Sequence, residues 1–320
     1  MRTHLLVDGS NFFIRAFCSC PHLDVNGEHV GGLIGTIRGV KVLARELKPT
    51  DITVVWDGAG GAVKRRAIYA EYKAGRKPKM NRAQDFDTPD QAADNMVRQH
   101  RLAHKYLELL GVRQVRVDGI EADDAIAYAA RHVLDELRVI VSTDRDFLQL
   151  VSTQVSVYNP VKRSTTVTDG FVGEHGVLPE NFVITKALMG DKSDNIPGVR
   201  GIGEKTVAKL FPDLATRECT LGDVFRHAEV HVGKSPKYGA VLAARELVIR
   251  NLELMQLSLP QIDPSAARAI REGLSAEPSL NLFDVKIEME RDGLQIKDVD
   301  FDTCFRAYWN RHLYPPKGQG

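Results

Sequence analysis

The sequence predicts an α/β fold in which a parallel-type central sheet is flanked by helices, followed by a C-terminal helical region. Short runs rich in Val, Ile and Leu recur through the first half of the 320-residue chain, and helical patterns separate them. This alternation is typical of a parallel sheet whose strands are covered on both faces. From about residue 181 onward, the pattern becomes helical throughout.

The elements follow from the apolar patterns in chain order. Apolar runs predict strands at 3–7, 51–56, 113–117, 138–142 and 155–158. Helical periodicity predicts helices at 32–47, 92–110 and 121–137, and a further helix beginning near Glu204. The polar stretch 78–91 contains two prolines and no periodicity, so we expect a loop or arch there. These elements suggest three parts: an α/β core over 1–180 with an arch at about 60–100, a helical part over 181–260, and a final segment, 261–320, that no pattern assigns.

Composition excludes several classes of protein. No run of 18 apolar residues exists, so no transmembrane helix is expected. Asp8 interrupts the N-terminal apolar run too early for a secretory signal, which favours a cytoplasmic location. The four cysteines (Cys18, Cys20, Cys219 and Cys304) lack metal-finger spacing and are expected to be free thiols.

The net charge of +1 averages over opposed patches. Between Lys64 and Arg82 the chain is strongly basic, with Glu71 as its single acid. Lys77, Lys79 and Arg82 belong to this segment, and we expect them to contact the phosphates of a nucleic acid. The alternative is a solvated charged face that binds nothing.

Carboxylates follow several of the predicted strands. Asp8, Asp57 and Asp144 lie at or just beyond strand ends, Asp146 follows closely, and Glu121, Asp123 and Asp124 open the helix after the third strand. The carboxyl ends of parallel strands meet at one edge of a sheet, where ligands bind. For the helix start alone a simpler explanation exists, because acids favour a helix N-terminus by about 0.3–1 kcal/mol each.

Converging carboxylates require cations. Two unit charges about 4 Å apart repel by roughly 4 kcal/mol near a protein surface. All-oxygen ligands favour Mg²⁺ or Mn²⁺ over zinc, and two such ions can clamp the attacking and leaving oxygens of a phosphodiester. The sequence therefore predicts a two-metal site at this edge of the sheet.

A second motif lies in residues 187–210. Asp191 and Asp194 stand in a polar turn, and Gly198, Gly201 and Gly203 directly precede the helix beginning near Glu204. A glycine-rich turn before a helix lets backbone N–H groups approach a phosphate. With Lys205 beside it, this turn fits a sequence-independent grip on a nucleic-acid backbone. A tight turn between helices is the alternative.

Six stretches together resemble one known family, the structure-specific 5′ nucleases, which include the 5′→3′ exonuclease domain of bacterial DNA polymerase I and the phage flap endonucleases. These stretches are LLVDGSN (5–11), VVWDG (54–58), EYKAGRKP (71–78), GIEADDAIA (119–127), STDRDFLQLV (142–151) and ALMGDKSDNIPGVRGIGEKT (187–206). The resemblance implies a PIN-like or resolvase-like nuclease core followed by a helix–two-turn–helix region.

The resemblance also implies roles for individual residues. Asp8, Asp57, Glu121 and Asp123 would surround a first Mg²⁺, with Asp124 close by, and Asp144, Asp146, Asp191 and Asp194 would serve a second. Lys73 and Arg76 would steer the scissile phosphate, and Tyr72 would stack on a base. Mn²⁺ could substitute for Mg²⁺, and the helix–two-turn–helix turn could bind K⁺.

The implied substrates are DNA flaps, nicks and single-strand/duplex junctions, with RNA primers as a further candidate. The implied enzyme is a monomeric 5′→3′ exonuclease and flap endonuclease of replication or repair. The chain departs from the family in its stretch before EYK, which lacks the usual Phe, and in the arch sequence NRAQDFDTPDQ.

Three other functions remain open. A non-catalytic DNA-junction-binding protein of the same fold should have lost carboxylates, whereas all nine candidate positions are acidic. A phosphotransferase or phosphatase using Asp8 as a nucleophile would, in the haloacid-dehalogenase type, need a second Asp where Ser10 stands. A small RNA-cleaving domain with the same sheet would not need the long arch.

Overall fold

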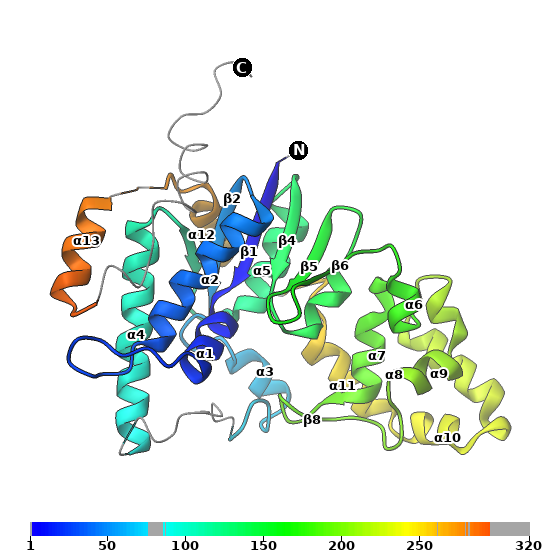
Figure 1. Ribbon diagram of the computed structural model, residues 1–320. Helices are drawn as coiled ribbons and strands as arrows, with labels where there is room; N and C mark the ends of the chain where they lie inside the picture. The colour runs from blue at the N-terminus through cyan, green and yellow to red at the C-terminus, as the bar shows by residue number, and fades with distance from the viewer. Residues whose placement is uncertain are drawn as a thin grey trace.

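The computed structural model describes residues 2–75, 86, 88–260, 262–278, 280 and 282–294. Its centre is a six-stranded sheet with the order β3-β2-β1-β4-β5-β6 (Figure 1). The strands are β1 Thr3–Asp8, β2 Asp51–Trp56, β3 Arg113–Arg116, β4 Leu137–Val141, β5 Val155–Asn159 and β6 Ser164–Thr166. The first five run parallel, and β6 pairs antiparallel with β5. The expected parallel-type sheet is therefore confirmed, while the short polar strand β6 was not predicted.

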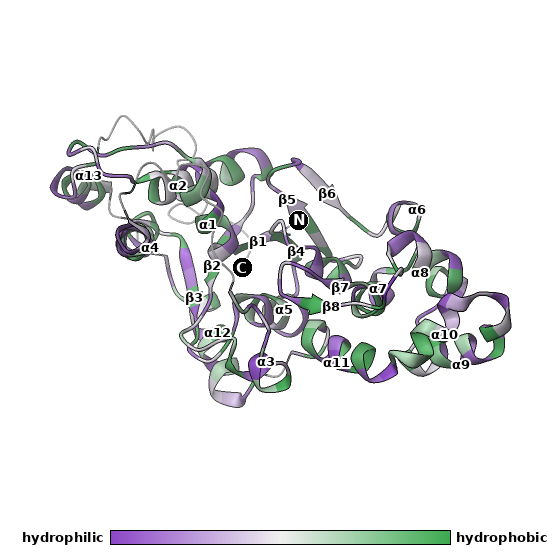
Figure 2. Ribbon diagram, turned by 90° about the horizontal axis from the view of Figure 1, so that it is seen from below, coloured by the Kyte–Doolittle hydropathy of each residue, from purple (hydrophilic) through white to green (hydrophobic). Residues whose placement is uncertain are grey.

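Alternate residues of the central strand β1 enter two cores on opposite faces of the sheet. Leu5 and Val7 pack in one core, with α1 Gly9–Ser19, α2 Gly31–Leu47, α4 Pro89–Leu109 and α13 Leu282–Arg291. Leu6 packs in the other, with α5 Ala122–His132, α7 Phe182–Met189, α11 Arg245–Met255 and α12 Pro264–Ser275. Figure 2 shows α1, α2, α4 and α13 on one side of the sheet and α5, α11 and α12 on the other.

A helical part lies beyond the β5–β6 edge of the sheet (Figure 1). Besides α7 and α11 it contains α6 Phe171–His175, α8 Glu204–Leu210, α9 Leu221–His231 and α10 Pro236–Ala243. The expectation of helix alone after residue 181 is wrong at one place. There, β7 Gly190–Asp191 pairs with β8 Ile196–Pro197 and orients the loop that carries the polar turn.

Three helices before residue 181, α1, α3 Val63–Ile68 and α6, were not predicted. Gly9-Ser10-Asn11 has the composition of a turn, yet Asp8 caps α1 by accepting a hydrogen bond from the Asn11 N–H at 3.0 Å. Helix α4 begins at Pro89, where Thr88 and Gln91 form a capping box, so the predicted loop 78–91 is wrong over its last residues. Helix α5 ends at His132, earlier than predicted.

The segment that the sequence left unassigned folds back onto the core over its described part. Helix α12 packs against β3 and α5, and α13 packs against α4. Lys105 and Tyr106 of α4 both donate hydrogen bonds to Asp292, just beyond α13. None of the helices in the described ranges is long and apolar enough to cross a membrane.

Candidate functional site

Three strand ends bring the first carboxylates together. Asp8 ends β1, Asp57 follows β2, and Asp144 lies just beyond β4. Asp8 is buried, and its Oδ2 accepts a hydrogen bond from the Ser142 hydroxyl at 2.8 Å. The same hydroxyl oxygen accepts the Asp144 N–H at 3.0 Å. Ser142 therefore fixes two of the predicted metal ligands relative to each other.

Asp57 joins the second strand end to the start of α5. Its N–H donates to the Ser10 hydroxyl at 3.0 Å, and its Oδ1 accepts the Ala122 N–H at 2.8 Å. Ser10 lies close to Asp8 in the chain, and Ala122 directly follows Glu121. The two hydrogen bonds of Asp57 therefore hold the segments that carry Asp8 and Glu121 next to each other.

The pKa values show that several of these carboxylates converge. Burial, together with the charges of Asp57 and Asp144, raises the pKa of Asp8 to about 7, although the hydrogen bonds from Asn11 and Ser142 act to lower it. The pKa of Asp123 lies well above its usual range because of burial and the charges of Asp144, Asp8 and Asp57, although Lys73 acts to lower it. The predicted edge of the sheet is thus an electrostatically crowded site that favours protons or cations.

Glu121 differs because it already has cationic partners. It is buried, and it accepts hydrogen bonds from Arg65 at 2.5 Å, Lys73 at 2.6 Å and the Tyr72 hydroxyl at 3.1 Å. Burial acts to raise the pKa of Glu121, but Lys73 and Arg65 lower it below its usual value. This carboxylate is therefore held ionised.

Asp124 takes part through Arg65. Its two oxygens accept hydrogen bonds from the two terminal nitrogens of the Arg65 guanidinium at 2.6 and 2.9 Å. The structure thus gives Asp124 an arginine partner, whereas the sequence suggested a place near a metal ion. In this position Asp124 holds Arg65 against Glu121.

Tyr72 requires a correction. Its ring is 3% exposed and packs in the core, because its hydroxyl reaches inward to Glu121. Stacking on a base, as predicted, is not available to a ring in this position. The other predicted contacts in this segment, Arg76, Lys77, Lys79 and Arg82, lie outside the described residues.

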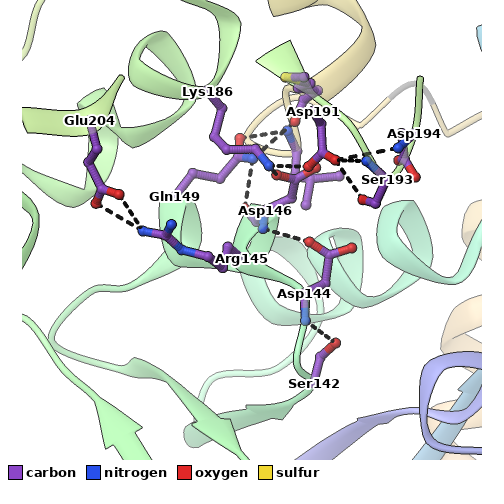
Figure 3. Close-up of polar contacts among 12 residues, drawn as sticks. Ser142, Asp144, Arg145, Asp146, Gln149, Lys186, Asp191, Ser193, Asp194 and Glu204 are labelled. Carbon is purple, nitrogen blue, oxygen red and sulfur yellow. Dashed lines mark hydrogen bonds and ion pairs between the residues drawn. The ribbon is translucent and has the colours of Figure 1, made fainter. Parts of the chain in front are cut away.

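The second group of carboxylates surrounds Lys186 (Figure 3). The Lys186 Nζ lies 2.8 Å from Asp146 Oδ1 and forms an ion pair with Asp191 Oδ2. Burial raises the pKa of Asp146 to about 7, with Asp144 adding to the effect and Lys186 opposing it. Burial acts to raise the pKa of Asp191 as well, but Lys186 and Ser193 bring it below its usual value.

Asp144 and Asp194 connect to this group through the backbone. Asp144 Oδ1 accepts the Asp146 N–H at 2.9 Å, and Asp191 Oδ1 accepts the Asp194 N–H at 3.4 Å (Figure 3). The Asp194 carbonyl accepts the Lys73 N–H at 3.0 Å. The polar turn that carries Asp191 and Asp194 is therefore attached to the segment that carries Lys73.

The three predicted glycines differ in their surroundings. A Cβ on Gly198 would lie 1.8 Å from the Met189 carbonyl oxygen, so this glycine is required by the pairing of β7 and β8. Gly201 has a φ of +78°, which favours glycine. Gly203, the N-cap of α8, has nothing within 4 Å of a Cβ placed on it. Gly203 thus leaves the start of α8 open to a ligand.

A groove of about 930 Å³ is lined both by this turn and by one of the predicted metal ligands. Its lining includes Asp144 and Arg145 together with Gly203, Glu204 and Lys205. Arg145 donates to both oxygens of Glu204 at 2.9 and 2.8 Å, and Glu204 Oε1 lies 2.9 Å from the Nδ1 of His175 (Figure 3 shows the Arg145 pair). This pair connects the start of α8 with the carboxylate site.

Arg65 and Lys186 were not predicted. Lys186 had a local signal, because it is the only charged residue in the segment FVITKALM of α7, whose other residues are apolar except for Thr185. Arg65 had none, since its neighbours Lys64 and Arg66 are also basic. Both are recognisable only from their partners, which lie on other elements.

A compact group of potential metal ligands lies at the opposite edge of the sheet. His4, Asp51 and Glu136 present ligand atoms within 4.8 Å of one another. These groups already have protein partners: His4 contacts Thr53 and Glu136, and Asp51 pairs with Arg113. The cluster is therefore a hydrogen-bonded network and is separate from the predicted carboxylate site.

Comparisons with known proteins agree with this arrangement. Residues 3–177 match the family described as 5′-3′ exonuclease, N-terminal resolvase-like domain, and residues 177–260 match 5′-3′ exonuclease, C-terminal SAM fold. A 5′-3′ exonuclease of Aquifex aeolicus is 31% identical over 94% of this chain and 89% of its own. A DNA polymerase I of Pseudomonas aeruginosa is 36% identical over 65% of this chain, but the match spans only 22% of that longer protein.

Among solved structures, the flap endonuclease of bacteriophage T5 has the same fold. Its structure, a complex with DNA and metal ions, matches with a TM-score of 0.65 and 23% identity, and the match covers 91% of this chain and 97% of that one.

Proposed function

Since the chain belongs to the 5′-3′ exonuclease family, whose members are hydrolytic nucleases, we propose that it is a metal-dependent 5′ nuclease. It would hydrolyse DNA phosphodiesters near single-strand/duplex junctions during replication or repair. The observation that carries this proposal is the convergence of Asp8, Asp57, Asp123 and Asp144 in a buried site, where burial and the neighbouring carboxylate charges raise the pKa values of Asp8 and Asp123. The relatives give no support to a non-catalytic junction-binding protein.

The residues present fit divalent ions. Like charges packed together in a partly buried site are destabilising unless cations lie among them. The buried Asp146 Oδ1 forms an ion pair with Lys186 at 2.8 Å and has no other polar partner among the described residues, so this oxygen retains ligand capacity. All the candidate ligands are carboxylates, which favour Mg²⁺ or Mn²⁺.

Two groups of residues would hold the ions. Asp8, Asp57, Glu121 and Asp123 would hold one, and Asp144, Asp146, Asp191 and Asp194 the other. Bound divalent ions would supply a hydroxide from water at neutral pH and would offset charge on the leaving 3′ oxygen. The protein's own contribution is to fix these carboxylates, as Ser142, Asn11 and Ala122 do through their hydrogen bonds.

Cationic residues would act on the phosphate itself. Lys73 lies at the edge of the carboxylate site, and Arg76 would assist it from the arch expected at about residues 60–100. Phosphate-binding side chains stabilise charge that develops in the transition state. We assign both residues this role, while Arg65 remains bound to Glu121 and Asp124.

The DNA duplex would be gripped at the glycine-rich turn. The N-terminus of α8, the open position at Gly203 and the charge of Lys205 suit a phosphate, and the groove leads from there to Asp144. The T5 relative bound to DNA supports this substrate class. K⁺ at the turn, RNA primers as substrates and a monomeric state remain predictions.

An Asp144→Asn substitution tests the function. With Mg²⁺ and a 5′-flap substrate, we expect cleavage to fall by roughly 100- to 1000-fold or more, as when one transition-state contact is lost. Binding of the same DNA in Ca²⁺ should change little. Cleavage near the wild-type rate with unchanged binding would contradict the metal role. A circular single-stranded substrate would show, if it were cut, that cleavage does not require a free 5′ end.

A further inference from the structure

Lys186 occupies an unusual position in the carboxylate site. It belongs to α7, in which nearly all side chains are buried, and its own side chain is 7% exposed. Its Nζ lies 2.8 Å from Asp146 and pairs with Asp191, and the three residues come from three separate elements (Figure 3). The ammonium group therefore stands between two carboxylates that the proposed function assigns to one metal ion.

We propose that Lys186 is a resident cation of the Asp146/Asp191 half of the site. It holds these two carboxylates together when no metal is bound, and it keeps the affinity of this half for divalent ions low. The inference rests on the metal site proposed above and adds to it a residue that lowers the affinity of one half of the site for divalent ions.

Each half of the site already contains a cationic partner. Glu121 of the first half pairs with Lys73 and Arg65. Asp146 and Asp191 of the second half share Lys186, so this pair carries one net negative charge where the side chains alone would carry two. Because charge attraction is strong in a partly buried site, a divalent ion should bind Asp146 and Asp191 less tightly with Lys186 in place than without it.

A purely structural role for the Lys186 ion pairs would lead to a different result. If Lys186 served only to connect α7 with its neighbours, its removal would leave two unpaired carboxylates and a less stable protein, with no gain in metal binding. If it is a resident cation, its removal should make the same two carboxylates a stronger site for a divalent ion. Metal affinity separates these cases, and it does not depend on activity.

The experiment compares Lys186→Met with wild type by Mn²⁺ titration calorimetry without DNA. We expect the variant to bind one Mn²⁺ at least about tenfold more tightly than wild type does, as the loss of a nearby positive charge requires. In EDTA, the melting temperature of the variant should lie below that of wild type. The increase in melting temperature on adding Ca²⁺ should be larger for the variant than for wild type. Lys186→Gln should show the same tightening and Lys186→Arg should not.

Lys105→Met provides a matched control. Lys105 also lies between two carboxylates, at 2.7 Å from Glu288 and 2.8 Å from Asp292, but on the far helices α4 and α13. Its loss should lower the melting temperature modestly and leave Mn²⁺ binding unchanged. If Lys186→Met folds only with divalent ions, the inference is supported. If neither neutral variant binds any Mn²⁺ more tightly than wild type does, the inference is overturned, while wild type that binds no Mn²⁺ overturns the proposed function first.

Discussion

Lys73 joins the two halves of the carboxylate site. Its Nζ donates to Glu121 Oε1 at 2.6 Å, and its backbone N–H donates to the Asp194 carbonyl at 3.0 Å. Its backbone has a φ of +54°, a conformation that costs energy for a residue with a side chain. These contacts fix a lysine at the edge of the site, at the start of the expected arch.

The first prediction concerns Lys73→Met. We expect kcat on a 5′-flap substrate in Mg²⁺ to fall by roughly 100- to 1000-fold, because a cation next to the scissile phosphate is lost. Single-turnover kinetics would measure it, with circular dichroism to check folding. The matched control is Lys64→Met, in the same basic segment but outside the site. Equal activity of Lys73→Met and wild type would remove Lys73 from the mechanism.

The edge of the sheet was predictable because a parallel sheet brings all its strand ends to one edge. Asp8, Asp57 and Asp144 are close in space for that reason alone, whatever the intervening sequence. Their cationic partners were not predictable in this way. Lys186 pairs with Asp146, which is distant in sequence, and Arg65 reaches Asp124 from another element, so both contacts depend on tertiary packing.

Local signals failed where tertiary contacts decided the structure. Helix α1 begins in a Gly-Ser-Asn sequence, which does not predict a helix. Its buried residues Phe13 and Phe17 pack in the core beside the sheet and so stabilise the helix. Tyr72 shows the same limit at the site. Its neighbours are polar, but its ring is buried because its hydroxyl reaches Glu121.

The second prediction concerns pH and metal. In the metal-free protein the pKa values of Asp8 and Asp146 lie at about 7, above their ordinary value of 3.8. The folded state then binds more protons than the unfolded state between about pH 4 and 7, so these groups make the free energy of unfolding fall as the pH rises through that range. Ca²⁺ needs the ionised carboxylates, so its stabilising effect should grow over the same range.

The measurement is the difference in melting temperature with Ca²⁺ and with EDTA, from pH 5.5 to 8. We expect a small difference at pH 5.5 and a several-fold larger one at pH 8. Burial lowers the pKa of His104 to about 4, so this group makes the free energy of unfolding rise with pH. The effect is the same in Ca²⁺ and in EDTA, and it therefore cancels in the difference. An Asp8→Asn variant should flatten the dependence. A difference that is independent of pH would contradict the predicted site.

The third prediction separates two glycines of the same turn. Gly198→Ala should destabilise the protein by about 3 kcal/mol or more, because its Cβ would collide with the Met189 carbonyl. Gly203→Ala should cost no more than about 1 kcal/mol, since the position is open and its φ of −132° suits any residue. It should nevertheless weaken duplex binding by roughly tenfold, because a methyl group would obstruct phosphate at the start of α8.

Denaturant unfolding and fluorescence anisotropy in Ca²⁺ measure the two effects. Gly233→Ala is a suitable control, because this glycine also has open space around a Cβ and lies away from the turn. If Gly203→Ala bound duplex DNA as tightly as wild type does, the turn would not be the phosphate grip.

The last prediction concerns the pair of Arg145 and Glu204. Arg145 stands between Asp144 and Asp146, and Glu204 is the first residue of α8, so their contact connects the carboxylates with the proposed duplex grip. The pair is partly exposed and should contribute less than about 1 kcal/mol to stability. A small displacement of a substrate can still cost up to about 100-fold in rate. We therefore expect Arg145→Gln to lower kcat/KM on a 5′ flap by roughly tenfold and to spread the cut positions.

A double-mutant cycle shows whether Arg145 acts through Glu204 or contacts phosphate directly. If the two residues act through each other, Glu204→Gln should cause a similar loss, and the double variant should be no worse than either single one. If Arg145 instead contacts phosphate directly, Glu204→Gln should leave the rate unchanged or raise it. Arg217→Gln, which breaks an exposed pair with Asp213 away from the groove, controls for the change in net charge. Additive losses in the cycle would show that the two residues act independently and that the α8 grip is positioned by other contacts.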